Sequence, residues 1–131
     1  MRPGERITFR PLEEYPQLVF PPKWRISGGF LQVPPKETLG VRLPKSDRAM
    51  TLEAKMRFPF ETRGTLIVRG DSVATREFRI DGQDAPSLRF AVAPGPERTI
   101  GLRFEFTPRL RRREALPVQL RDLRIRSLRL D

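Results

Sequence analysis

The chain has 131 residues, a formal net charge of +10, and neither Cys nor His. This length suits a single domain whose core is large enough to need no metal or disulfide for folding. The absence of Cys and His excludes disulfides, thiolate chemistry, histidine metal ligands and the Ser-His-Asp and Cys-His catalytic arrangements.

Residues 1–22 are predicted to form an extended, proline-rich N-terminal arm, and residues 23–131 a single β domain. Eight of the 14 prolines lie in residues 1–50, and proline prevents the short apolar runs between them from joining into a helix. These runs are predicted as short edge strands or as parts of an extended arm that crosses the surface of the sheet. They are Ile7–Phe9, Leu18–Phe20, Trp24–Ile26, Phe30–Val33 and Leu39–Leu43.

The arm and the residues just after it are rich in aromatic side chains. This content is too high for a solvated tail, so we expect the segment to pack on its own domain or on a neighbouring subunit. The candidate partner-binding residues of the arm are Phe9, Tyr15, Phe20 and Trp24.

Regular strands are predicted from residue 51 onward. Thr99–Thr107 alternates strictly between apolar and polar residues, which is typical of a half-buried strand, and we expect it to lie at the centre of the core. Similar patterns predict further strands at Leu52–Phe58, Thr65–Arg69, Val73–Asp81 and Leu88–Val92. Residues 93–98 contain Pro and Gly and are predicted to connect Leu88–Val92 to Ile100–Phe106 as a hairpin.

The last segment of the chain has an irregular apolar spacing. Apolar residues occur at positions 118, 120, 123, 125, 128 and 130, and each step of three turns the following side chains to the other face. We therefore expect β-bulges or breaks near Arg121-Asp122 and Arg126-Ser127. The whole pattern predicts an all-β protein, an antiparallel β-sandwich or jelly roll of about seven to nine strands.

Several short motifs resemble those of concanavalin-like jelly-roll domains. Residues 24–31, WRISGGFL, are similar to the family's "W-x-V-x-x-G-x-L" opening, and residues 51–58, TLEAKMRF, to its "F-x-L-x-x-x-x-R-F" strand. Residues 100–102 and 120–126 resemble its closing "G-x-I-G-L … F-R-N-I-R-I" pattern. The resemblance spans most of residues 24–130 and implies a two-sheet jelly roll, a fold often used to hold glycans on a concave face.

The excess of positive charge lies at the two ends of the chain. Residues 1–50 carry +4, residues 51–106 carry +1 and residues 107–131 carry +5, which suggests an acidic partner. The predicted basic patch consists of Arg109, Arg111, Arg112, Arg113, Arg124 and Arg126. No aromatic residue follows Phe106, which argues against nucleic acid because single strands are bound by stacking on aromatic rings.

Two carboxylates, Glu53 and Glu105, lie on the polar faces of predicted strands and would have to converge for glycoside hydrolysis. Each has Arg or Lys neighbours, so cross-strand ion pairing is the simpler interpretation. Asp71, Asp81 and Asp84 lie in predicted turns, where Asp commonly bonds its own backbone instead of holding a cation. The sequence therefore predicts no catalytic residue, metal site or cofactor.

Other features of the sequence bear on the source organism and on the location of the protein in the cell. Asn is absent and Arg outnumbers Lys by 22 to 4, which favours a thermophilic source, although a GC-rich genome produces the same bias. No apolar run reaches the roughly 20 residues that span a bilayer, and residues 1–16 lack the apolar region of a signal peptide. We expect synthesis in the cytoplasm, no membrane association and, for a phage-encoded chain, a place in the virion.

Together these features predict a non-catalytic structural or assembly protein. The most specific prediction is a bacteriophage virion component, a capsid decoration, cement or tail accessory protein that binds an acidic protein lattice or forms a homo-oligomer. The alternative is a carbohydrate-binding jelly-roll module in which Tyr15 and Trp24 line a sugar platform.

Overall fold

The computed structural model describes the whole chain except residue 35 and residues 59–62, 72, 82–86 and 109–122. This part of the chain contains eleven strands and no helix, which confirms the prediction of an all-β protein. The strands are β1 (Arg6–Thr8), β2 (Leu18–Val19), β3 (Ile26–Ser27), β4 (Phe30–Val33), β5 (Thr38–Leu43), β6 (Met50–Arg57), β7 (Arg63–Gly70), β8 (Val73–Asp81), β9 (Leu88–Val92), β10 (Arg98–Pro108) and β11 (Leu123–Leu130).

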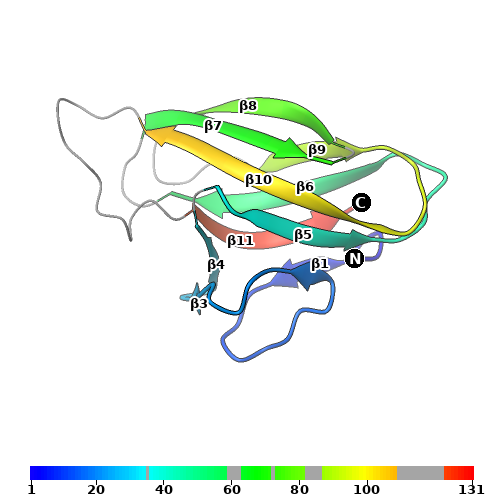
Figure 1. The fold of residues 1–131 in the computed structure, drawn as a ribbon, viewed down its shortest axis with the longest axis horizontal. Helices are drawn as coiled ribbons and strands as arrows, with labels where there is room; N and C mark the ends of the chain where they lie inside the picture. The colour runs from blue at the N-terminus through cyan, green and yellow to red at the C-terminus, as the bar shows by residue number, and fades with distance from the viewer. Residues whose placement is uncertain (35, 59–62, 72, 82–86, 109–122) are drawn as a thin grey trace.

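All eleven strands belong to one antiparallel sheet that curls into a half-barrel (Figure 1). Its order is β2-β5-β10-β7-β8-β9-β6-β11-β4-β3, with β1 also paired to β11. We call β2, β5, β10, β7 and β8 the β10 half, and the remaining strands the β6 half. The halves meet where β8 and β9 share one paired position, Val73 with Val92. Because of the curl, β5 and β10 pass in front of β6 and β11 in Figure 1.

Residues 1–22, predicted as an extended arm, contribute two strands to the sheet. β1 pairs with β11 in the β6 half, and β2 pairs with β5 at the end of the β10 half. The backbone N–H of Gly4 also donates to the carbonyl of Leu130 at 2.6 Å. The segment therefore bridges the two halves of the curled sheet and packs on its own domain.

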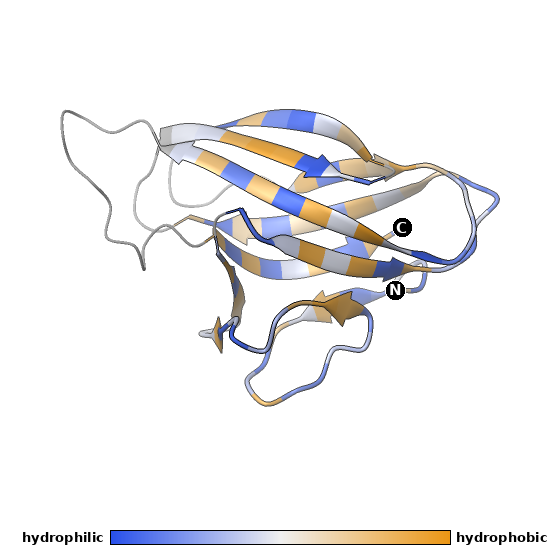
Figure 2. Cartoon of the chain, viewed as in Figure 1, coloured by the Kyte–Doolittle hydropathy of each residue, from blue (hydrophilic) through white to orange (hydrophobic). Residues whose placement is uncertain are grey.

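The core lies on the concave side of the sheet. Hydropathy alternates along the strands in Figure 2, because successive residues of a strand point to opposite faces. The largest fully buried side chains come from both halves, among them Phe58 and Phe90 from the β6 half and Phe104 and Leu102 from the β10 half. Burial of these apolar groups from two facing surfaces is the main stabilising contribution to the fold.

Most strands lie where the alternation predicts them. β8 and β9 have the predicted bounds, β7 and β10 extend beyond theirs by one or two residues at each end, and β6 begins two residues earlier and ends one residue earlier than predicted. β10 lies between β5 and β7 and buries Ile100, Leu102 and Phe104 almost completely. The prediction that Thr99–Thr107 forms a central core strand is confirmed.

The predicted hairpin between β9 and β10 is wrong. β9 pairs with β6 and β10 with β5 and β7, so the two strands lie in different halves of the sheet. The connection between them instead bridges to the β5–β6 connection through Ser46 and Gly95, whose backbone groups exchange two hydrogen bonds of 2.9 Å. A Pro- and Gly-rich link is compatible with a crossing between halves as well as with a hairpin, and local sequence does not distinguish them.

The predicted bulge in the last strand is confirmed. The register of β11 against β6 shifts between Ile125 and Ser127, so that Arg126 is the extra residue. The shift allows Ile125 and Leu128, three positions apart, both to be fully buried. The second predicted irregularity, at Arg121-Asp122, lies outside the described residues.

Candidate functional site

The four aromatic residues predicted to bind a partner lie against the core of their own chain. Phe9 and Trp24 are buried, with 3% and 6% of their surface exposed, and Tyr15 and Phe20 are partly buried against the same core. The rings form two pairs, Phe9 with Tyr15 at 5.3 Å between centroids and Phe20 stacked on Trp24 at 5.6 Å. Their contacts therefore fix residues 1–24 onto the sheet.

The indole of Trp24 is also held by a polar contact. Its Nε1 donates to Glu37 Oε2 at 2.6 Å, and the ammonium of Lys23 lies 2.6 Å from the other oxygen of Glu37. The hydrogen bond from Lys23, followed by the one from Trp24, lowers the pKa of Glu37 below its usual value. A sugar stacking on Trp24 would have to displace Phe20 from the indole, so the geometry does not present Trp24 as a platform.

The predicted basic patch is only partly within the described residues. Arg109, Arg111, Arg112 and Arg113 lie outside them. Arg124 and Arg126 lie on β11, where Arg124 is half-buried and Arg126 is exposed at the bulge. These two arginines belong to a larger group of cations on the convex side of the β6 half.

We call this group the basic face. Its strands bury every second side chain, so the intervening residues share the opposite, convex side. The cations of the basic face are Arg6 on β1, Lys55 and Arg57 on β6, Arg89 on β9, and Arg124, Arg126 and Arg129 on β11. Two carboxylates, Glu53 and Asp131, lie among them, so the described residues of the face carry a net charge of +5.

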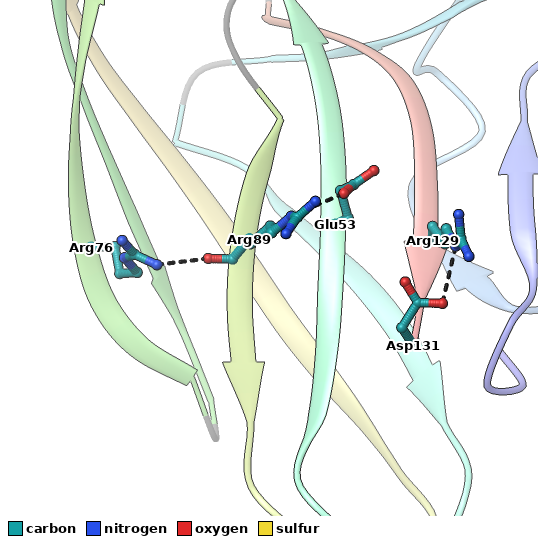
Figure 3. A network of polar contacts seen from close by, with 5 residues as sticks. All are labelled: Glu53, Arg76, Arg89, Arg129 and Asp131. Atoms are coloured by element: carbon teal, nitrogen blue, oxygen red, sulfur yellow. Dashed lines mark hydrogen bonds and ion pairs between the residues drawn. The ribbon is translucent and has the colours of Figure 1, made fainter.

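One cross-strand row passes through the middle of the basic face. Arg6 pairs with Arg129, Arg129 with Glu53 and Glu53 with Arg89, on four successive strands. Figure 3 shows the ion pairs of this row, Arg89 Nε to Glu53 Oε2 at 3.1 Å and Arg129 Nε to Asp131 Oδ1 at 3.0 Å. The carboxylates hold two guanidinium groups in place, while both arginines stay at least 40% exposed.

The bulge adds cations to one end of the basic face. Arg126 is inserted beside Ser127, which pairs with Lys55, so two exposed cations lie on adjacent strands there. Further along, Arg124 pairs with Arg57, whose guanidinium lies 5.9 Å from the centroid of the Phe30 ring. Like charges that face each other across strands destabilise a sheet. This end of the basic face therefore carries four cations, Lys55, Arg57, Arg124 and Arg126, on two adjacent strands.

The described residues do not bring together the carboxylates considered for glycoside hydrolysis or the aspartates considered for a cation site. Glu53 pairs with Arg89 in the β6 half, whereas Glu105 lies in the β10 half, 3.5 Å from Arg69 and 3.4 Å from Arg103. Cross-strand ion pairing, predicted for both carboxylates, is confirmed. Asp71 and Asp81 are exposed, and Asp84 lies outside the described residues. No group of three potential metal ligands occurs in the part of the chain that the structure describes.

No helix among the described residues is long and apolar enough to cross a membrane.

The basic patch predicted from the sequence includes Arg124 and Arg126 but not Arg6, Lys55, Arg57 or Arg89. The prediction considered only local runs of positive charge. Arg6, Lys55 and Arg89 are instead single cations that lie far apart in the sequence. The sequence did contain a signal for these cations, because Arg6, Lys55 and Arg89 each occupy a polar position in a strand that alternates between apolar and polar residues. Only the strand order shows that these positions share one surface.

Comparisons with protein-family models, with curated proteins and with solved structures each found no match to this chain.

Proposed function

We propose that this chain is a non-catalytic assembly protein that docks on an acidic protein surface through the basic face. The observation that carries the proposal is the cross-strand row Arg6–Arg129–Glu53–Arg89, in which ion pairs with Glu53 and Asp131 hold the guanidinium groups of Arg89 and Arg129. Arginine forms planar, bidentate contacts with carboxylates, and ion pairs within the row keep its side chains oriented before a partner binds.

An acidic protein fits this face better than a nucleic acid. Glu53 and Asp131 place negative charge within the cationic row, where they would repel phosphates but could pair with basic residues of a protein partner. The ring of Phe30 is half-buried and one of its faces lies against Arg57, which leaves less of it for stacking on a base. A protein surface with many carboxylates and some cations complements this pattern.

The predicted virion component, such as a capsid decoration or tail accessory protein, is one example of an assembly protein of this kind and stays a prediction.

We also propose that the two halves of the sheet act as the layers of a jelly-roll β-sandwich. The single paired position between β8 and β9 and the edge-on contact of Phe78 with Phe90 at 5.9 Å support this, because they mark a fold between the halves. Glycan binding, the alternative, has less support since Trp24 is buried.

The test measures binding to immobilised poly-L-glutamate, a model of an acidic protein surface, at low and near-physiological salt. The variant Lys55→Glu with Arg126→Glu reverses two exposed cations of the basic face that adjoin the bulge. The matched control, Arg48→Glu with Arg79→Glu, makes the same change of net charge at exposed positions outside the face. We expect the face variant to weaken binding about tenfold or more relative to the control.

Equal weakening by the two variants would show that net charge alone drives binding and would overturn the proposal. Duplex DNA is measured in parallel. DNA binding that is tighter than poly-L-glutamate binding, and that only the face variant removes, would assign the basic face to nucleic acid instead.

A further inference from the structure

Leu12 is the most unusual exposed residue of the described chain. It is an apolar side chain that is fully exposed, at 104% of its reference surface, and its backbone has a φ of 65°. Residues other than Gly seldom adopt this left-handed conformation, and leucine has no side-chain hydrogen bond to favour it. Leu12 follows Pro11 and precedes Glu13 and Glu14, all three exposed.

The loop that carries Leu12 is anchored at its two ends. The backbone N–H of Arg10 donates to Tyr15 Oη at 2.6 Å, and the Tyr15 ring packs against buried Phe9. Tyr15 therefore closes the loop at its base. Leu12 is therefore an exposed apolar projection flanked by Glu13, whose Oε2 lies 3.4 Å from Tyr15 Oη, and by Glu14, which suits an anchor of a protein interface.

The same chain contains a cavity of about 560 Å³ with complementary chemistry. It lies between the N-terminal segment and the end of β5. Arg2, Arg42 and Lys45 line it with positive charge, and half-buried Pro44 adds a small apolar surface beside Leu43 and Met1, which are buried. It is open to solvent, so a side chain of another molecule can reach it.

Two carboxylates also line the cavity, Glu5 and Glu97. Glu5 is engaged within the chain, since it accepts hydrogen bonds from the backbone N–H of Arg2 at 3.0 Å and from Gln17 Nε2 at 3.2 Å. The cations outnumber the carboxylates by three to two even without the Met1 ammonium, so the cavity favours an acidic occupant.

We propose that Leu12 of one copy inserts into this cavity of a second copy, with Glu13 and Glu14 pairing with Arg2, Arg42 and Lys45. Leu12 makes no such contact within its own chain, because it is fully exposed. The contact joins two different surfaces, so two copies can exchange it reciprocally or successive copies can repeat it. The proposal does not depend on the basic face, which is a separate surface.

The net charge of +10 sets a condition on this contact. Copies of the chain repel one another at low ionic strength, and salt screens that long-range repulsion more than it screens a close, partly buried pairing. We therefore expect self-association to increase when salt is raised from low to near-physiological concentration, the reverse of the salt dependence expected for binding to poly-L-glutamate.

Because the chain has no Cys, disulfide trapping can test the contact directly. Purified full-length Leu12→Cys and Lys45→Cys proteins are mixed and oxidised with a glutathione buffer. We expect a mixed disulfide of twice the 15.2 kDa chain mass to form about tenfold faster than with the matched pair Leu12→Cys and Thr75→Cys, since Thr75 is exposed outside the cavity. Adding Glu13→Lys and Glu14→Lys to the Leu12→Cys chain should remove this preference.

A second variant separates association from folding. Leu12→Gly removes the apolar projection and suits a positive φ, so the melting temperature should stay equal or rise. We expect sedimentation equilibrium to show that this variant self-associates at least about tenfold more weakly than the unmodified chain. Equal trapping rates for the two cysteine pairs, or unchanged self-association of Leu12→Gly, would overturn the proposal and leave the function of the basic face unaffected.

Discussion

The guanidinium of Arg76 on β8 donates a hydrogen bond of 2.9 Å to the backbone carbonyl of Arg89 on β9. The bond spans the junction where the described strands share only the pair of Val73 with Val92. The Arg76 guanidinium also lies 5.2 Å from the ring centroid of Phe78, whose edge-on partner is Phe90 on the opposite side of the junction. A side chain thus replaces backbone pairing where the two halves diverge (Figure 3).

Substituting Arg76→Ala should lower the free energy of unfolding by about 1–2 kcal/mol, because it removes this hydrogen bond and the contact with Phe78. Urea denaturation followed by circular dichroism measures the change. Arg79→Ala, which removes an exposed cation from the same strand, is the control and should stay within about 0.5 kcal/mol of the unmodified chain. Equal losses for both variants would show that the contact does not stabilise the junction.

Phe9→Ala should destabilise the isolated chain by about 3 kcal/mol or more, because Phe9 is 97% buried in the chain's own core. A residue whose ring binds only a neighbouring subunit would show little change in a dilute sample. Thermal unfolding at low protein concentration distinguishes the two, with exposed Arg10→Ala as the control. A melting temperature like that of the control would return residues 1–22 to the role of a free arm.

Gly40→Ala should be destabilising through the contact of β5 with β2. A Cβ at position 40 would lie 2.8 Å from the Cβ of Val19, too close without movement of the backbone. We expect a loss of about 1–3 kcal/mol. A double-mutant cycle with Val19→Gly, measured by urea denaturation, should recover part of it because the opposing Cβ is removed. Strict additivity of the two substitutions would place the clash elsewhere.

Glu37 should contribute to a loss of stability in acid. Its pKa in the folded chain is lowered, first by Lys23 and also by Trp24, so the folded state favours the ionised carboxylate. This stabilisation is fully present above the unfolded pKa of about 4.3 and disappears as the pH falls through the lower folded pKa. Melting temperatures measured between neutral pH and pH 3 should therefore fall more steeply for the unmodified chain than for Glu37→Gln. The exposed Glu14→Gln variant is the control and should follow the unmodified chain. If the melting temperature of Glu37→Gln fell in parallel with both, ionisation of Glu37 would not contribute to stability in acid.

The strands of this fold could be read from the sequence because their alternation is a local property. Val73–Asp81 and Leu88–Val92 were predicted at their observed bounds, and the step of three between Ile125 and Leu128 predicted the bulge beside Arg126. Burial on one face imposes a period of two wherever a strand lies in the sheet. Side-chain spacing therefore carries this information without knowledge of the partner strand.

Strand partners and the basic face could not be predicted in this way. The β9–β10 hairpin was expected because the two strands adjoin in sequence, but β9 pairs with β6 and β8, and β10 pairs with β5 and β7. Similarly, Arg6 meets Arg129 only through the pairing of β1 with β11. Such contacts depend on the packing of the whole core, which the local pattern of one segment does not specify.

The position of β11 has a consequence for the order in which the chain can fold. β11 pairs with β6 on one side and with both β1 and β4 on the other, so three strands from the first half of the sequence depend on it. During synthesis these strands have no complete set of partners until residues 123–130 have left the ribosome. Pairing between such distant segments is slow, because the entropy of closing a long loop is lost before its contacts form. The chain therefore completes its native structure late. Until β11 pairs with β6, the backbone groups along that edge of β6 are unpaired and open to pairing with another chain.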